Sequence, residues 1–160
     1  MREACDVIEL SETALRQCCA ASRWVAGMLA AQPFADADAA LAAADAVWRE
    51  LGPDDWLEAF AAHPRIGDRT ASGASAREQA GVRGADADTL AALAEGNRAY
   101  ERRFGFVFLI CATGKTAGEM LAALRARIDN DRATELRIAA AEQLQITRLR
   151  LARALKEASR

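Results

Sequence analysis

Alanine constrains this chain more than any other residue, because it fills 40 of the 160 positions. Leucine, arginine and glutamate are also abundant, whereas proline occurs three times and β-branched runs are nearly absent. All four abundant residues have high helix propensity, so the composition favours helices throughout. Without the alanines, about 43 larger apolar side chains remain, which is enough for one core at this length but not for two. The sequence therefore predicts a single compact all-α domain over residues 1–160.

Apolar periodicity, helix caps and helix breakers predict six to eight helices. Ser75–Glu78 and Thr116–Glu119 each match the pattern of a capping box, and Gly105 ends a helix. Residues 63–74 contain a proline and two glycines and are predicted to form a loop. The helices are expected at about 11–31, 36–51, 54–62, a short stretch from 75, 88–103, 116–130 and 131–158.

One apolar run does not follow the helical pattern. Residues 106–112 are continuously apolar and lie between Gly105 and Gly114. Periodicity does not separate a buried strand, a buried helical turn and an extended chain here. We interpret the run as an extended or irregular buried segment that lines a pocket.

Charge and targeting patterns exclude several classes of protein. The formal net charge is −2 and the isoelectric point is near 5.5, which predicts neither a nucleic-acid partner nor an anionic membrane partner. No stretch approaches the roughly 18 consecutive apolar residues of a transmembrane helix. The N-terminal residues lack a secretory pattern and the C-terminal residues are not a peroxisomal signal. We therefore expect a cytoplasmic protein.

Metal and phosphate motifs are also missing. The four cysteines (Cys5, Cys18, Cys19 and Cys111) form no C-x-x-C pair, and one histidine accompanies them, so we expect reduced thiols and no metal site. Gly114-Lys115-Thr116 lacks the first glycine of a phosphate-binding loop, because position 109 is leucine. For most of the arginines near the C-terminus, including Arg148, Arg150 and Arg153, a solvated helix face is the expected role.

His63 and Glu78 are the residues best suited to acid–base chemistry. His63 is the only histidine and precedes Pro64, which biases it away from helical backbone and places it at the head of the predicted loop. Imidazole titrates near neutrality and suits proton transfer, although a histidine that merely anchors the loop also fits. Glu78 either closes the capping box or serves as a carboxylate partner of His63. Ser75 and Gln79 lie at the same predicted helix start, where backbone N–H groups can bind an anion.

Several blocks in one order resemble a known family. Residues 61–68 (Ala-Ala-His-Pro-Arg-Ile-Gly-Asp), 75–81 (Ser-Ala-Arg-Glu-Gln-Ala-Gly) and 104–112 (Phe-Gly-Phe-Val-Phe-Leu-Ile-Cys-Ala) resemble the signature blocks of OHCU decarboxylases. These enzymes act on 2-oxo-4-hydroxy-4-carboxy-5-ureidoimidazoline in urate breakdown. Cys18-Cys19 followed by Trp24, and residues 146–151, also fit. Gln32 departs from the pattern, since many members have arginine before the Pro-Phe pair, and the loop after His63 is shorter than in animal members and resembles a bacterial type.

The resemblance implies a function and a set of site residues. It implies an all-helical, commonly homodimeric lyase that produces (S)-allantoin in purine degradation without a metal or an organic cofactor. His63 and Glu78 are then expected to be catalytic. Glu78 would orient His63 or bind the ureido group of the substrate. The expected substrate-binding residues are Pro64, Ser75, Gln79, Phe108, Leu109, Ile110 and, from the last helix, Arg150 in preference to Arg148 or Arg153.

Two other functions remain open from the residues alone. The chain could be a non-catalytic helical interaction module in which Phe106, Phe108 and Ile110 form a groove for a partner helix. It could also be a cofactor-free hydrolase that uses the same pair, His63 and Glu78. Both alternatives require the ordered family blocks to be coincidental.

Overall fold

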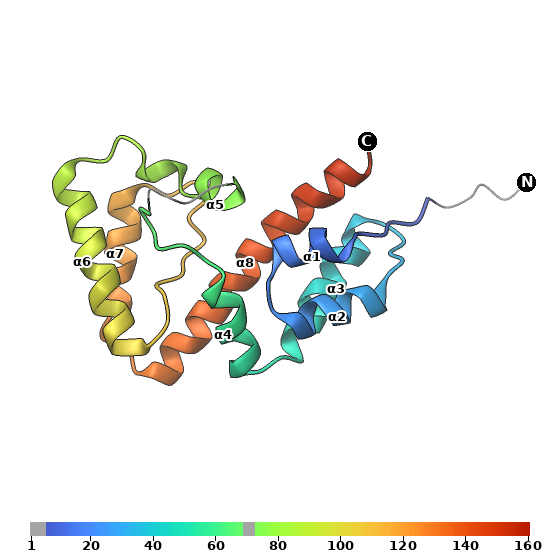
Figure 1. The fold of residues 1–160 in the computed structure, drawn as a ribbon, viewed down its shortest axis with the longest axis horizontal. Helices are drawn as coiled ribbons and strands as arrows, with labels where there is room; N and C mark the ends of the chain where they lie inside the picture. Colours follow the sequence, from blue (N-terminus) through green and yellow to red (C-terminus); the bar gives the residue numbers. More distant parts are fainter. Residues whose placement is uncertain (1–5, 69–72) are drawn as a thin grey trace, which may run out of the picture. The chain divides into compact units, whose positions relative to one another are not determined.

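The computed structural model describes residues 6–68 and 73–160, which contain eight α-helices, one 3₁₀ helix and one isolated β-bridge (Figure 1). The prediction of an all-α fold with six to eight helices is confirmed for these residues. Cys5, expected to be a reduced thiol, lies outside them. The chain divides into two compact units, which we call the terminal unit (Met1–Ala59 with Leu144–Arg160) and the central unit (Phe60–Gln143). That residues 1–160 act as one domain stays a prediction.

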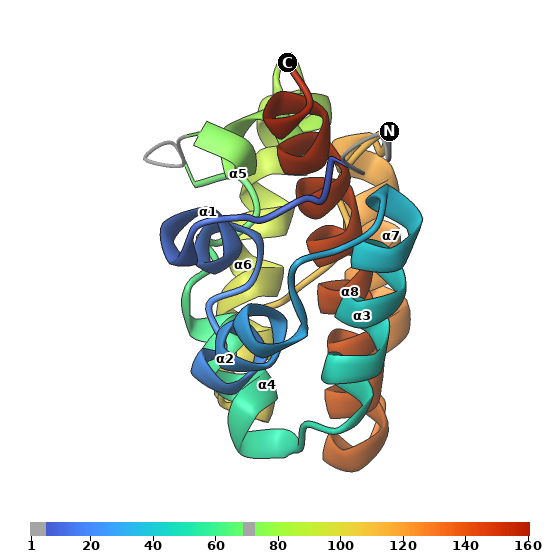
Figure 2. The ribbon, with the colours of Figure 1, turned by 90° about the vertical axis from the view of Figure 1, so that its right-hand side faces the viewer.

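The terminal unit is built on tryptophan and alanine side chains. Its helices are α1 (Glu12–Cys18), α2 (Ser22–Ala31), α3 (Ala37–Arg49), α4 (Pro53–Ala61) as far as Ala59, and the C-terminal part of α8 (Arg132–Ala158). Helix α2 packs against α3 (Figure 2). Trp24 is fully buried, and its Nε1 donates to the carbonyl of the equally buried Ala44 at 3.3 Å. The small alanine side chain lets the indole lie against the α3 backbone.

The first predicted helix is in fact two helices. Helix α1 ends at Cys18, Cys19 is extended with φ −154° and ψ 127°, and α2 begins at Ser22. The new start is stabilised by a distant group, because the Ser22 N–H donates to the carboxylate of Glu58 on α4. A carboxylate at a helix N-terminus satisfies a free N–H group and complements the helix dipole. Periodicity over residues 11–31 does not reveal a cap that lies 36 residues away.

The central unit contains the helices on which the candidate site is built. They are α5 (Gly73–Glu78), the 3₁₀ helix η1 (Ala80–Val82), α6 (Ala87–Phe104), α7 (Ala117–Arg127) and α8 as far as Gln143. Helices α6 and α7 pack side by side (Figure 1). Their ends follow the sequence signals: Gly105 ends α6 with φ +80°, and Thr116 and Glu119 form the expected capping box at α7.

The capping box predicted at Ser75 and Glu78 is wrong. Helix α5 begins at Gly73, so Ser75 lies inside it, and the Ser75 carbonyl accepts from the Gln79 N–H at 3.1 Å. Glu78 is the last residue of the helix, and Gln79 follows it. Ser75 lies in the first turn of α5 and Gln79 is the N-cap residue of η1, so the two residues do not share one helix start. The Ser-x-x-Glu pattern here is the ordinary i, i+3 spacing of two residues within one helix.

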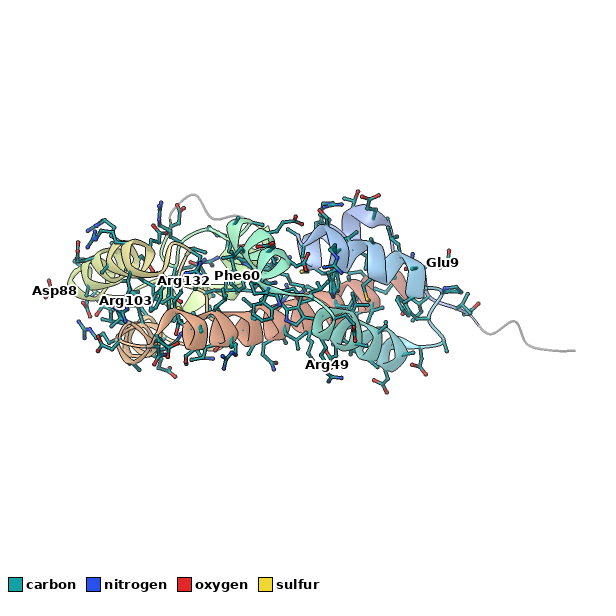
Figure 3. All side chains as sticks on the ribbon, turned by 90° about the horizontal axis from the view of Figure 1, so that it is seen from below. Glu9, Arg49, Phe60, Asp88, Arg103 and Arg132 are labelled. Carbon is teal, nitrogen blue, oxygen red and sulfur yellow. The ribbon has the colours of Figure 1, made fainter. Side chains whose placement is uncertain are left out.

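The apolar run 106–112 is an irregular buried segment, as expected, with no regular secondary structure from 107 to 112. Its aromatic side chains join the core: the ring of Phe106 lies 5.5 Å from that of Phe60, which is labelled in Figure 3. The guanidinium of Arg132 lies over the Phe106 ring, 5.7 Å from its centroid. The segment is therefore anchored by its side chains rather than by a sheet.

Gly81 allows η1 to approach the turn that follows this segment. A Cβ atom on Gly81 would lie 1.8 Å from the carbonyl oxygen of Lys115, so any other residue would force the backbones apart. The backbone of η1, which follows α5, therefore packs directly against the backbone at Lys115.

Candidate active site

His63 lies just beyond α4 and contacts a buried amide. Helix α4 ends at Ala61, and the His63 N–H donates to the carbonyl of Phe60 at 3.1 Å. The imidazole is half-buried, and its Nε2 lies 2.7 Å from Oε1 of Gln143 on α8. Gln143 is only 1% exposed. His63 is therefore held at the head of the loop, with Pro64 half-buried beside it.

The backbone of the loop is held by two carboxamides. Asn97 on α6 donates from Nδ2 to the carbonyl of Ile66 at 2.9 Å, and Gln79 Oε1 accepts from the Gly67 N–H at 2.9 Å. Asn97 is 1% exposed and Gln79 is 9% exposed, so neither side chain is free to move into solvent. Both bonds lie within five residues of His63 and hold the backbone at Ile66 and Gly67.

Helix α6 also holds the loop through charge. Arg65 makes two hydrogen bonds to the carboxylate of Glu101, at 2.8 and 3.1 Å. Glu101 lies one helical turn beyond Asn97, so both residues present to the same stretch of loop. The pair is largely exposed, and its contribution to stability is small, but it favours one loop position.

Two cavities are lined in part by residues 65–68. One has a volume of about 390 Å³ and is lined by Gly67, Asp68, Gln79 and Ala76, together with Val82, Arg83, Gly84 and Leu90. The other, of about 380 Å³, is lined by Arg65, Ile66, Gly67, Asp68, Ala94, Asn97 and Arg98. Both cavities meet at residues 67 and 68, so they adjoin the loop a few residues beyond His63. Each is large enough for part of a small heterocyclic ligand.

The irregular segment is tied to α8 beside Gln143. The Cys111 N–H donates to Oε2 of Glu142 at 3.0 Å, and Lys115 Nζ donates to the Cys111 carbonyl at 3.0 Å. Burial raises the pKa of the Cys111 thiol, and the carboxylates of Glu142 and Glu78 raise it further. Glu78 therefore lies within electrostatic range of the segment. Its expected role beside His63 stays a prediction.

A buried ionic network also binds the irregular segment 106–112. Arg127 on α7 donates from Nη1 to the Leu109 carbonyl at 2.8 Å and from Nε to Glu135 Oε1 at 2.7 Å. Glu135 is fully buried, and it also accepts from the Tyr100 hydroxyl and from Asn130 Nδ2. Burial raises the pKa of Tyr100 far above its ordinary value, and the bond to Glu135 adds to the shift. The phenol is therefore a fixed donor.

This network limits what the segment can offer to a ligand. The Leu109 carbonyl is already bound to Arg127, and the Phe108 ring packs against Tyr100 and under the Arg127 guanidinium, at 5.3 and 4.8 Å. Ile110 is 3% exposed. Binding of substrate by residues 108–110 stays a prediction.

Arg150 belongs to the terminal unit. Its Nη1 donates to the Gln17 carbonyl at 3.3 Å, and its charge lowers the pKa of the buried thiols of Cys18 and Cys19, although burial still raises each to about 11. Arg148 forms an ion pair with Asp45 at 2.5 Å. A contact between Arg150 and substrate stays a prediction.

Sequence reasoning missed the polar residues that hold the site. Asn97 interrupts the buried face of α6, where Leu93, Tyr100 and Phe104 are apolar. Gln143 lies four residues before Thr147 and three after Ala140, on the buried face of α8. A polar residue on an otherwise apolar stripe must find a partner inside the protein. That signal was present in the sequence, but it does not name the partner.

No metal centre and no membrane span are found in the described ranges. Residues 6–68 and 73–160 contain no cluster of three or more histidine, cysteine, aspartate or glutamate side chains that could hold a metal ion. Within the same ranges, no helix combines the length and the apolar character needed to cross a bilayer.

Comparison with known proteins identifies the family. The OHCU decarboxylase family model matches residues 9–152. A crystal structure of OHCU decarboxylase in the presence of (S)-allantoin superposes with a TM-score of 0.82 and 37% sequence identity, covering 92% of this chain and 99% of that one. The uric acid degradation bifunctional protein TTL of Arabidopsis thaliana is 36% identical over 154 residues, which are 91% of this chain and 48% of that protein. This chain thus spans about half the length of that relative.

A second relative matches along most of its own length. The 2-oxo-4-hydroxy-4-carboxy-5-ureidoimidazoline decarboxylase of Haloferax volcanii is 32% identical over 138 residues, or 82% of this chain and 80% of that protein. The family match extends beyond the candidate site to both units. The chain belongs to the OHCU decarboxylase family.

Proposed function

We propose that this protein decarboxylates 2-oxo-4-hydroxy-4-carboxy-5-ureidoimidazoline to (S)-allantoin in urate degradation. The observation that carries the proposal is the family match over residues 9–152, in which the only imidazole of the chain is held against buried Gln143 at the head of a braced loop. A fixed, half-buried imidazole suits proton transfer on a small heterocycle.

The substrate itself accounts for the absence of any cofactor in the proposed reaction. The bond between C4 and the carboxylate breaks, CO₂ leaves, and the electron pair passes through C5 to the ring imine nitrogen, which takes a proton from solvent. The resulting enol then loses the proton of its 4-hydroxyl while C5 gains one, so C4 becomes a carbonyl. The net change is loss of CO₂ and uptake of one proton. The protein has to hold the ring and deliver the C5 proton to one face.

The proposed roles of individual residues follow the family resemblance. His63 would accept the 4-hydroxyl proton or return a proton to C5. Glu78 would accept hydrogen bonds from the ureido group. Gln79 faces the 390 Å³ cavity, and with Pro64 and Ser75 it would contact the ring. The resemblance also implies that Arg150 would bind a substrate carbonyl or carboxylate in a bidentate manner.

The family resemblance also supports a domain extent, an oligomeric state and a cellular location for the enzyme. We infer one functional domain over residues 1–160, a homodimer in solution and a cytoplasmic location. Neither nucleic acid nor membrane has a part in the proposed reaction.

The activity is tested with substrate generated freshly from urate by oxidation and hydrolysis. After dialysis of the protein against a strong chelator, we expect rapid CO₂ release and a circular dichroism signal of (S)-allantoin, measured against a protein-free baseline. Retained activity after chelation is expected because the imine of the substrate accepts the electron pair. Hydrolysis without CO₂ release would favour the hydrolase alternative, and no acceleration would contradict any catalytic role.

Replacing Glu78 with glutamine is expected to lower turnover by at least about tenfold. Hydrogen bonds to a charged group are worth about 1.5–3 kcal/mol, and glutamine keeps the shape while losing the charge. The melting temperature should stay unchanged or rise slightly, because Glu78 ends α5 and a carboxylate is unfavourable at a helix C-terminus.

The matched control is Glu119→Gln. Glu119 closes the capping box of α7 and is exposed, and glutamine also serves that position. This variant should keep wild-type turnover. Near-normal turnover in Glu78→Gln, measured with the same substrate preparation, would remove Glu78 from the proposed site.

A further inference from the structure

A histidine that moves protons needs its two ring nitrogens to be distinguished. In a neutral imidazole one nitrogen carries the proton and the other accepts, and the partner of one nitrogen decides which is which. The carboxylate Glu78 was the candidate for this task from the sequence. The contact observed at Nε2, however, is with Gln143.

The chemistry of the Gln143 side chain determines the direction of this bond. Its Oε1 can only accept a hydrogen bond, so at 2.7 Å the His63 Nε2 must carry the proton. The neutral ring then has its lone pair on Nδ1. A carboxylate at the same position would instead favour the charged imidazolium, whereas an amide fixes the tautomer without adding charge.

Packing holds the Gln143 amide in place. The side chain is 1% exposed, and Ala139 and Ala140 on the preceding turn of α8 are 0% and 5% exposed. The adjacent residue, Glu142, binds the Cys111 N–H at 3.0 Å. This stretch of α8 is thus tied to the irregular segment, and the amide cannot turn away without leaving polar atoms buried.

We propose that Gln143 is the positioning residue of His63: it holds the proton on Nε2 and leaves Nδ1 as the nitrogen that accepts and returns the proton during the reaction. The catalytic part of this assignment rests on the proposed decarboxylation. The tautomer itself is a property of the free protein. In this assignment Gln143, rather than Glu78, orients the ring, and the proposed role of Glu78 is to bind the substrate.

The single histidine allows a direct test by nuclear magnetic resonance. Protein labelled with ¹⁵N-histidine gives one pair of ring nitrogen signals, because no other imidazole is present. The pH is raised until these signals no longer change, so that the neutral ring is observed. We expect a protonated Nε2 with a slowly exchanging proton and an unprotonated Nδ1. A neutral ring protonated on Nδ1 would overturn the proposal without any variant.

Two variants and a control separate positioning from stability. Gln143→Met keeps the length of the side chain but removes the acceptor, so the protected Nε2 proton should disappear and kcat should fall at least about tenfold with little change in KM. Gln143→Glu keeps an acceptor and should retain the Nε2 proton. Gln145→Leu, an exposed position two residues along α8, should match the wild type in both measurements.

The spectra and the kinetics test different parts of the proposal. An unchanged, protected Nε2 proton in folded Gln143→Met would overturn the role of Gln143. Loss of that proton with unchanged kcat would overturn the assignment of Nδ1 as the reacting nitrogen. If the wild-type spectrum is as expected but no allantoin forms, the proposed function fails while the tautomer assignment stands.

Discussion

Replacing His63 with asparagine is expected to lower turnover by about two to four decades, the usual contribution of a general acid–base residue. His63 is the only imidazole in the chain, and asparagine does not titrate near neutrality. The reaction would then depend on solvent to move protons at the 4-hydroxyl and at C5. The measurement is kcat with freshly generated substrate, read from the dichroism of the product.

A structural cost of this variant is also expected and must be measured. Asparagine is too short to place a donor where Nε2 lies, so buried Gln143 would lose this partner, at about 1–3 kcal/mol. Denaturant unfolding of the same preparation shows whether the protein remains folded under assay conditions. Folded His63→Asn that retained more than about a third of wild-type turnover would remove His63 from the mechanism.

Replacing Glu135 with alanine is expected to cause the largest loss of stability. Glu135 is fully buried and binds Arg127, Tyr100 and Asn130. Without it, the guanidinium of Arg127 stays buried without its counter-charge. Removing one partner of a buried ion pair costs about 3–5 kcal/mol, which is a large share of the stability of a typical domain. Urea unfolding followed by far-ultraviolet circular dichroism measures the change.

Two controls show whether the unpaired charge causes this loss. The double variant Arg127→Met, Glu135→Leu removes both charges and should be more stable than Glu135→Ala alone, because no unpaired charge remains. Glu95→Ala breaks an exposed ion pair with Arg98 at 2.8 Å and should stay within about 1 kcal/mol of wild type. If Glu135→Ala behaved like Glu95→Ala, the buried network would not be what supports the segment.

Local signals explain which helix ends could be predicted. Gly105 ends α6 because glycine adopts a left-handed backbone without strain, and Thr116 with Glu119 starts α7 because each side chain satisfies a backbone N–H of the same turn. The information needed lies within four residues in both cases. The break between Cys18 and Ser22 depends on Glu58, so a reading of that stretch alone merged two helices.

The same distinction holds for the candidate site. His63 could be found from the sequence because it is unique and precedes a proline. Gln143 and Asn97 could not be assigned, because their roles depend on partners 80 and 31 residues away. The failed capping box at Ser75 shows the opposite error, in which a four-residue pattern occurred inside a helix rather than at its start.

The irregular segment has a consequence for protein engineering. Its backbone is held by side chains from elsewhere: Arg127 binds the Leu109 carbonyl, Glu142 the Cys111 N–H and Lys115 the Cys111 carbonyl. A peptide of residues 105–114 alone would therefore have no shape of its own. Moving this segment into another scaffold in the same conformation would require α7 and the first half of α8 to be transplanted with it, as one cassette.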